Sequence, residues 1–102
     1  MIQHSVIFTL RHSPGSDEES AFLEATNVLK SIPGVRNFRR LRQTSGKNPF
    51  SFGLSMEFES EAAYEAYNSH PIHQEFVESR WIPEVTDFLE VDTLDYEADA
   101  QP

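Results

Sequence analysis

The chain has no cysteine among its 102 residues. A disulfide framework, thiolate chemistry and a cysteine-based metal site are therefore excluded. Long hydrophobic runs are also missing, because no apolar segment approaches the roughly 18–20 residues that a membrane-spanning helix needs. The opening stretch, residues 2–10, alternates in polarity and carries no basic leader or cleavage signal, so we expect no signal peptide there. From these absences we expect a cytoplasmic protein.

Basic residues are scarce in this chain. The sequence holds 8 Lys and Arg against 17 Asp and Glu, and its formal net charge is −9. Such a surface repels phosphate backbones and anionic headgroups, so we expect no nucleic-acid partner and no membrane partner. The length suits one domain, which we place at residues 1–96, followed by an acidic flexible tail at residues 97–102.

Hydrophobic periodicity divides the chain into strands and helices. Residues 2–10 and 50–58 alternate apolar and polar side chains, which is typical of half-buried strands. Weaker strand patterns cover residues 86–96 and residues 35–44. In residues 35–44 apolar side chains recur every three positions, a spacing that a bulge reconciles with a strand. Helical spacing predicts helices over residues 17–31, 61–68 and 71 to 80 or 81. Ser16 with Glu19, and Ser60, are expected to cap the first two helices, and Pro71 opens the third.

The expected order of elements is β-α-β-β-α-β, with the second helix split at Pro71. This order defines an α+β fold of the ferredoxin-like type, a four-stranded antiparallel sheet with its helices on one face. The other face carries small and semi-polar residues, which suit packing against a second copy of the chain. We therefore expect a homodimer formed through the open sheet face. Its expected residues are Ser5, Ile7, Thr9, Ser51, Gly53 and Ser55.

His73 and His4 are the candidate chemical groups. His4 shares the bulky apolar face of the first strand, and His73 lies on the apolar side of the helix that Pro71 opens. Both imidazoles are expected to face the space between helices and sheet, where a ring that titrates near neutral pH can move protons. The alternative interpretation is structural, with each ring buried and bonded to a backbone carbonyl or to Tyr67.

Five segments, taken in order, carry a resemblance to a known family. They are Met1–Phe8, Ser31–Val35, Phe58–Glu61, Tyr67–His73 and Asp87–Phe88. Together they resemble the stress-responsive A/B barrel (Dabb) domain family of the dimeric α/β-barrel superfamily, from residue 2 to about residue 96. The resemblance implies a dimeric α/β barrel built by residues 1–96.

What the resemblance implies about function is less definite. Most members have no known activity, some are stress-inducible and form stable assemblies, and a few are polyketide cyclases that use neither metal nor cofactor. In the cyclases the histidine matching His73 is the proposed acid/base, helped by the histidine matching His4, and a pocket tyrosine matches Tyr67. Ala25 stands where the cyclases carry a second pocket tyrosine. The expected catalytic residues are thus His73, His4 and Tyr67, and the expected pocket residues are Phe8, Ala25, Leu29, Phe76 and Val77.

Two further clusters have an ordinary and a functional interpretation. His70 and His73 are three residues apart, but a metal site needs three or four ligands, so we expect no metal and no cofactor, and His70 is better explained as a helix cap. Five of the eight basic residues fall between Arg36 and Lys47. Arg36, Arg39, Arg40 and Arg42 either bind an anionic substrate or, as we favour, form exposed ion pairs with the surplus acidic residues.

Three functions remain open from the sequence. The chain is a cofactor-free enzyme or binder of small hydrophobic keto or phenolic compounds, a non-enzymatic stress-associated oligomeric protein, or a cofactor-independent monooxygenase of the kind found elsewhere in the superfamily. A cavity of roughly several hundred cubic ångströms beside His73 favours the first function. A filled core with both imidazoles bonded to the backbone favours the second.

Overall fold

The computed structural model describes residues 1–97 of the chain. The expected acidic tail, residues 97–102, lies outside the described residues except for Glu97. The strands are β1 (Ile2–Leu10), β2 (Arg36–Arg42), β3 (Phe52–Phe58) and β4 (Val85–Thr93). The helical segments are α1 (Asp17–Ala25), η1 (Thr26–Ser31), α2 (Glu61–Ser69), α3 (Pro71–Phe76), η2 (Val77–Trp81) and α4 (Ile82–Glu84).

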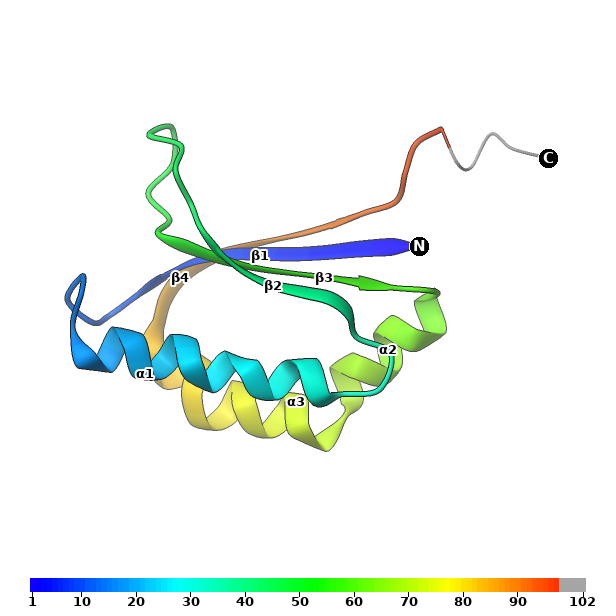
Figure 1. Cartoon of the computed structure of the whole chain (residues 1–102), viewed down its shortest axis with the longest axis horizontal. Coiled ribbons are helices and arrows are strands. Elements are labelled where there is room, and N and C mark those ends of the chain that lie inside the picture. The colour runs from blue at the N-terminus through cyan, green and yellow to red at the C-terminus, as the bar shows by residue number, and fades with distance from the viewer. Residues whose placement is uncertain (98–102) are drawn as a thin grey trace.

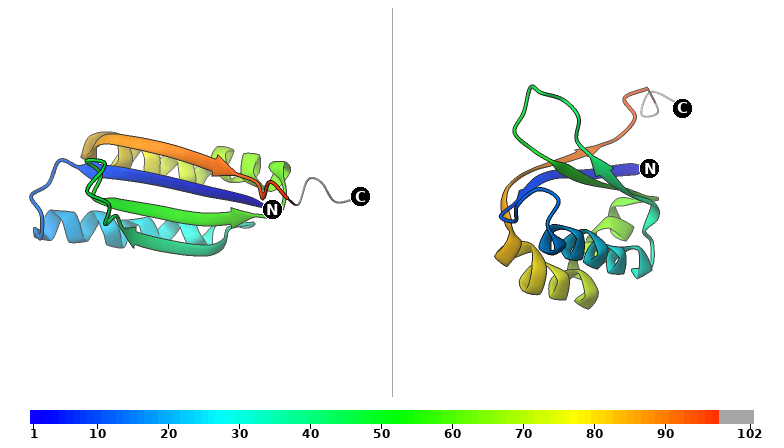
Figure 2. Two further views of the ribbon diagram at one scale, coloured as in Figure 1. Left: turned by 90° about the horizontal axis from the view of Figure 1, so that it is seen from above. Right: turned by 60° about the vertical axis from the view of Figure 1, so that its left-hand side comes forward.

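The strands form one antiparallel sheet in the order β2-β3-β1-β4. All helical segments lie on one face of this sheet, and the other face is left uncovered (Figure 1). Seen from above, α1 runs beneath the β2–β3 side, while α2 and α3 run beneath the β4 side (Figure 2). The element order and the one-sided helical layer confirm the expected ferredoxin-like α+β fold. The sheet of a single chain is open and does not close into a barrel.

The alternation of β1 decides which side chains enter the core. Its even-numbered residues are all buried against the helices, whereas the odd-numbered residues from Ser5 to Thr9 are only partly buried. β1 is central in the sheet and pairs with β3 on one side and β4 on the other. Its even face therefore defines one side of both the packed core and the cavity described below.

An aromatic cluster fills the core at the C-terminal end of β1. The Phe8 ring lies 5.1 Å from Trp81, 5.7 Å from Phe22 and 6.2 Å from Phe52, measured between ring centroids. Phe8 and Phe22 are both 0% exposed. Each buried aromatic ring removes a large apolar area from water, and edge-to-face packing of this kind adds a further stabilisation.

The helix boundaries follow the expected caps. The Ser16 hydroxyl accepts from the Glu19 N–H at 3.2 Å, and Ser60 does the same for Ala63 at 3.2 Å. The expected helix over residues 17–31 is a composite, since it tightens into the 3-10 turns of η1 after Ala25. The third helical segment runs past Pro83 rather than ending before it. A π-helical turn, η2, continues into α4, which contains Pro83.

The expected bulge in the second strand is confirmed. The register of β2 against β3 shifts between Arg36 and Arg39, and Asn37 in the bulge has a φ of 51°. Asparagine tolerates this left-handed conformation better than most residues. Gly34, with a φ of 93°, turns the chain from the end of η1 towards β2, where a residue with a Cβ is strained.

The uncovered sheet face is more apolar than the expected residue set. Ile7 lies between Gly53 on β3 and Leu89 on β4, and Ser5 lies between Ser55 and Val91. Leu89 and Val91 are 50% and 44% exposed, although neither was expected on this face. Ser51 precedes β3 instead of belonging to it. Within residues 1–97, no helix has both the length and the hydropathy to cross a membrane.

Replacing Phe8 with Ala tests the aromatic cluster. We expect the variant to lose about 3–5 kcal/mol of unfolding free energy, because the large cavity it leaves is enclosed by rigid rings. Urea denaturation followed by circular dichroism measures this loss. Val28→Ala, at a side chain that is 43% exposed, is the control and should change stability by less than about 1 kcal/mol. Equal losses in the two variants contradict this description of the core.

Candidate functional site

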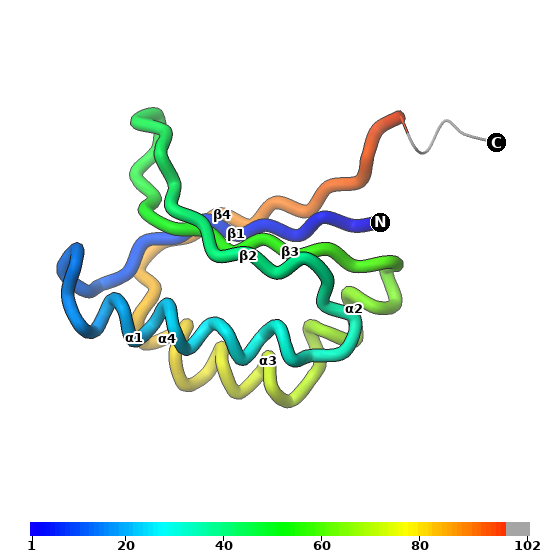
Figure 3. The backbone as a smooth tube through the Cα atoms, viewed as in Figure 1, coloured from blue at the N-terminus to red at the C-terminus, as the bar shows by residue number. Residues whose placement is uncertain are grey.

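A cavity of about 370 Å³ lies between the sheet and the helices, beside the aromatic cluster. Its lining residues come from β1, β3 and β4 of the sheet and from η1, α2, α3, η2 and α4 of the helical layer. Figure 3 shows the sheet above and the helical layer below it. Most of the wall is apolar, and the polar groups gather on the α2 and β4 side. The apolar lining consists of Val6, Leu29, Leu54, Met56, Phe76, Val77, Trp81, Ile82 and Phe88, and the polar lining of His4, Tyr67, Asn68, His73 and Glu90.

His4 is held by a carboxylate and a phenol from two other elements. Its Nδ1 lies 2.6 Å from Oδ1 of Asp92, the residue opposite it on β4. The Tyr64 hydroxyl donates to Oδ2 of Asp92 at 2.8 Å and lies 2.9 Å from His4 Nδ1. A carboxylate only accepts hydrogen bonds, so His4 Nδ1 carries a proton. In neutral His4 the lone pair is then on Nε2.

His73 is oriented by the helix end before it. Its Nδ1 lies 3.0 Å from the backbone carbonyl oxygen of Asn68, which also only accepts. Nδ1 therefore carries the proton, and Nε2 of the neutral ring carries the lone pair. Burial lowers the pKa of His73 below its ordinary 6.5, and the nearby His4 ring also lowers it, while the Asn68 carbonyl works in the opposite direction. His73 is thus a neutral proton acceptor at neutral pH.

Tyr67 lies near both imidazoles. Its ring centroid is 4.5 Å from that of His73 and 6.2 Å from that of His4, and its side chain is buried. Burial raises the pKa of Tyr67 well above its usual range, and the charge of Glu90 adds to this effect. The hydroxyl therefore stays protonated and can donate a hydrogen bond into the cavity. Two potential proton acceptors and one donor thus share a single apolar chamber.

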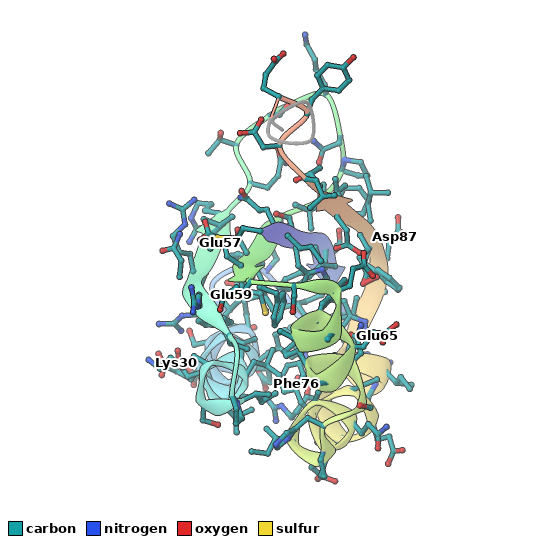
Figure 4. The ribbon with its side chains drawn as sticks, turned by 90° about the vertical axis from the view of Figure 1, so that its right-hand side faces the viewer. Lys30, Glu57, Glu59, Glu65, Phe76 and Asp87 are labelled. Atoms are coloured by element: carbon teal, nitrogen blue, oxygen red, sulfur yellow. The ribbon has the colours of Figure 1, made fainter. Side chains whose placement is uncertain are left out.

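The structure brings together six of the eight expected site residues. These are His4, Tyr67, His73, Leu29, Phe76 and Val77, which all line the cavity. Figure 4 shows Phe76 in the interior, between the helices, whereas Glu65 lies on the outer side of α2. The catalytic roles of the three polar residues are proposals, taken up below.

Two expected pocket residues lie elsewhere. Phe8 is enclosed by the rings of the aromatic cluster and does not reach the cavity. Ala25 faces a separate depression between α1 and α3, next to Val28 and Ile72. The reason is helical phase, since Phe22, Thr26 and Leu29, at spacings of four and three, are the residues that point at the sheet. Ala25 is about 100° away from Thr26 around the helix.

Several site residues were missed by the sequence analysis. Asp92, Glu90 and Phe88 share the helix-facing side of β4, because they pair with His4, Val6 and Phe8 of β1. The alternation of β4 carries this information once its register against β1 is known. Trp81 was placed at a helix end and Tyr64 among the core aromatics, but only the folded chain shows that they contact the cavity and His4.

The other expected clusters have structural explanations. His70 caps α3, since its Nδ1 accepts from the Ile72 N–H at 3.1 Å. Among residues 1–97, no three His, Asp or Glu side chains are grouped as a metal site. Arg36 pairs with Glu59 at 2.9 Å and Arg40 with Glu24 at 3.4 Å, and all four side chains are exposed, so these pairs add little stability.

The fold and the cavity define a ferredoxin-like α+β domain with an open sheet and a histidine-lined chamber on its helical side. The profile of the Dabb family, described as the stress responsive A/B barrel domain, matches residues 2–95. The chain belongs to this family, which confirms the resemblance seen in the sequence. No match was found among curated proteins.

Solved structures share this fold. A Dabb family protein from Mesorhizobium loti is 50% identical, with a TM-score of 0.90 over 92% of this chain and 95% of that one. A dimeric ferredoxin-like protein of unknown function from Thermobifida fusca is 21% identical, with a TM-score of 0.76 over 92% and 90%. The hydroxynitrile lyase from Passiflora edulis is 14% identical, with a TM-score of 0.81 over 94% of each chain. At the two lower identities the likeness shows the fold alone.

The lowered pKa of His73 can be measured directly. We expect its ring to titrate with a midpoint below 6.5 in an NMR titration, with the signal assigned by its loss in His73→Gln. The unfolded chain binds that proton more readily, so unfolding free energy should fall as the pH drops from about 6.5 towards the folded midpoint. His73→Gln should flatten that part of the pH dependence. A midpoint at or above 6.5 contradicts the burial of this ring.

Proposed function

We propose that the protein is a cofactor-free enzyme or binder that acts on a small hydrophobic keto or phenolic compound held in this cavity. The proposal includes the cytoplasmic location expected from the composition and a reaction class like that of the polyketide cyclases. One observation supports it most: His4, Tyr67 and His73 line a single apolar cavity of about 370 Å³, a size suited to a small organic ligand.

The arrangement supports a proton-transfer mechanism. His73 takes a proton from the carbon next to a substrate carbonyl through Nε2, and the electron pair of that C–H bond moves towards the carbonyl oxygen. The Tyr67 hydroxyl donates a hydrogen bond to the oxygen as negative charge develops on it. The imidazolium then returns the proton to the enolate or to the carbon skeleton formed from it, which restores neutral His73.

His4 supports this chemistry from the sheet. Asp92 and Tyr64 hold its ring in one orientation, and the Nδ1–H to Asp92 bond keeps Nε2 as the acceptor. An imidazole in this state can share a proton with the substrate opposite His73. Asp92 and Tyr64 are positioning residues in this proposal, because they act through His4.

The non-enzymatic alternative has one observation in its favour. His73 is bonded to the backbone carbonyl of Asn68, as a structural histidine would be. The cavity beside it supports the first proposal more strongly, since a purely structural ring needs no empty space next to it.

We also propose that two copies of the chain pair through the open sheet face. The support is the apolar surface there, where Ile7, Leu41, Leu89 and Val91 surround small residues such as Gly53. A Cβ added to Gly53 would lie only 3.2 Å from the Ile7 side chain, so this part of the face is already close-packed. A second sheet covering it would close the barrel that one chain leaves open.

Exchange of the α-proton in D₂O tests the chemistry without knowledge of the product. A panel of aromatic ketones and β-dicarbonyl compounds is incubated with the protein, and loss of the α-proton signal is followed by NMR. We expect catalysed exchange with at least one compound and a loss of about 10²–10⁴-fold in His73→Gln. The melting temperature of His73→Gln should stay within a few degrees of the wild type.

His70→Asn is the matched control, because it removes a neighbouring imidazole outside the cavity lining and keeps a side chain able to cap α3. It should retain exchange. A His73→Gln variant that binds and exchanges like the wild type refutes His73 as the base. Loss of stability in His73→Gln, with no binding and no exchange in the wild type, favours the structural alternative.

Ile7→Asp tests the proposed dimer. A charge in the centre of the open face should weaken association about 100-fold or more, because the buried carboxylate would have no partner. Analytical ultracentrifugation over a concentration series measures the change. Val28→Asp, on the exposed side of the helical layer, is the control and should leave association unchanged. A monomeric wild-type protein, or a dimer unaffected by Ile7→Asp, contradicts the pairing.

A further inference from the structure

The charge of the cavity is one-sided. Among the described residues that line it, Glu90 is the one carboxylate, and none is Lys or Arg. The remaining polar groups are two imidazoles, a phenol and an amide. The arginine cluster lies on β2, a strand that does not line this cavity. Arg80 of η2 pairs with Glu84 and lines the separate depression next to Ala25. A negative charge carried into the cavity would thus meet Glu90 without a fixed cation to offset it.

Glu90 lies at the side of the cavity where the reacting groups are. It pairs with Val6 across the β1–β4 ladder and lies between Phe88 and Asp92 on the helix-facing side of β4. Its charge raises the pKa of Tyr67 and opposes the lowering of the His73 pKa, which places it within electrostatic reach of both. Glu90 therefore acts on the same space as the proposed proton acceptor and hydrogen-bond donor.

The two carboxylates on this side of β4 have different roles. Both oxygens of Asp92 are engaged, one with His4 at 2.6 Å and the other with Tyr64 at 2.8 Å. None of the five ion pairs found among residues 1–97 includes Glu90. Its carboxylate is thus available to accept a hydrogen bond from a ligand in the cavity.

We propose that Glu90 determines the charge class of the ligand: the cavity takes neutral or cationic compounds that present a hydrogen-bond donor, and it rejects free carboxylates. This inference rests on the proposed function and narrows its substrate class. The compounds that fit are ketones and phenols with a hydroxyl or amino group, in which the apolar body contacts the wall and the donor meets Glu90. A β-keto acid in its ionised form is excluded by the same charge.

Binding of three acetophenones that differ only in one para substituent tests this inference. The substituents are hydroxymethyl, which is neutral, aminomethyl, which is cationic, and carboxylate. Trp81 is the one tryptophan of the chain and lines the cavity, so its fluorescence reports the dissociation constants. In the wild type we expect the hydroxymethyl and aminomethyl compounds to bind about tenfold or more tightly than the carboxylate.

Glu90→Gln keeps the size of the side chain and removes its charge. We expect the carboxylate compound to bind this variant within about threefold of the hydroxymethyl compound, because the repulsion is gone. Glu65→Gln is the matched control, since it removes the same charge from the exposed side of α2 (Figure 4) and should retain the full wild-type discrimination. It separates the effect of Glu90 from that of the net charge of the whole protein.

Salt provides a measurement that needs no variant. Raising the ionic strength from roughly 0.01 M to 1 M should reduce the wild-type discrimination, because the repulsion from an exposed carboxylate is screened. Discrimination that persists in Glu90→Gln, or that is equally lost in Glu65→Gln, overturns the inference. So does a wild type that binds the carboxylate as tightly as the neutral compound.

These outcomes are distinct from those that test the chemistry. If the neutral compounds bind with the expected charge preference but no α-proton exchange occurs, the proposed catalysis fails and the role of Glu90 stands. If exchange is catalysed and depends on His73 without any charge preference, the catalysis stands and the role of Glu90 fails. A wild type that binds none of the three compounds overturns both.

Discussion

The strict alternation of β1 is the constraint on which the rest of the structure depends. As a central strand it pairs with both β3 and β4, so its pleat decides which side of each neighbour faces the helices. A register slip of one residue on β4 would turn Asp92 to the uncovered face and leave His4 without its carboxylate. The same slip would move Phe88 and Glu90 from the helix-facing side to the uncovered face. Core, cavity and open face are therefore consequences of one pattern.

The space under the sheet is divided by the size and polarity of the side chains. At one end, Phe8, Phe22 and Trp81 interlock and leave no room. At the other end, Val6, Leu54 and Met56 form an apolar wall on the sheet side, and the aromatic residues on the helical side, Tyr67 and His73, carry polar atoms. Polar atoms in an apolar space require partners, and backbone or carboxylate groups satisfy only one nitrogen of each histidine ring. The remaining nitrogen of each ring can accept a proton from a ligand in the cavity.

Membership of the family establishes the fold, whereas the activity depends on the residues that line the cavity. Proteins that share this architecture at 14–21% identity include a hydroxynitrile lyase and a protein of unknown function. A shared fold does not imply a shared reaction, because function depends on a few side chains placed on it. In this chain the wall contains an acidic residue, Glu90, and the small residue Ala25 is turned away from it.

The amino-acid sequence by itself determined the element order, the fold class, the helix caps, the β2 bulge and the inward direction of His4, because these follow from local periodicity and capping. It also predicted that His73 faces the space between the helices and the sheet. Only the tertiary structure decided which part of the space under the sheet is filled and which is empty. Phe8 and Ala25 therefore do not line the cavity, whereas Trp81, Phe88 and Glu90 do. The partners Asp92 and Tyr64 likewise depend on a register that pairs residues 88 positions apart. Contacts over such sequence separations arise from packing, which no local pattern encodes.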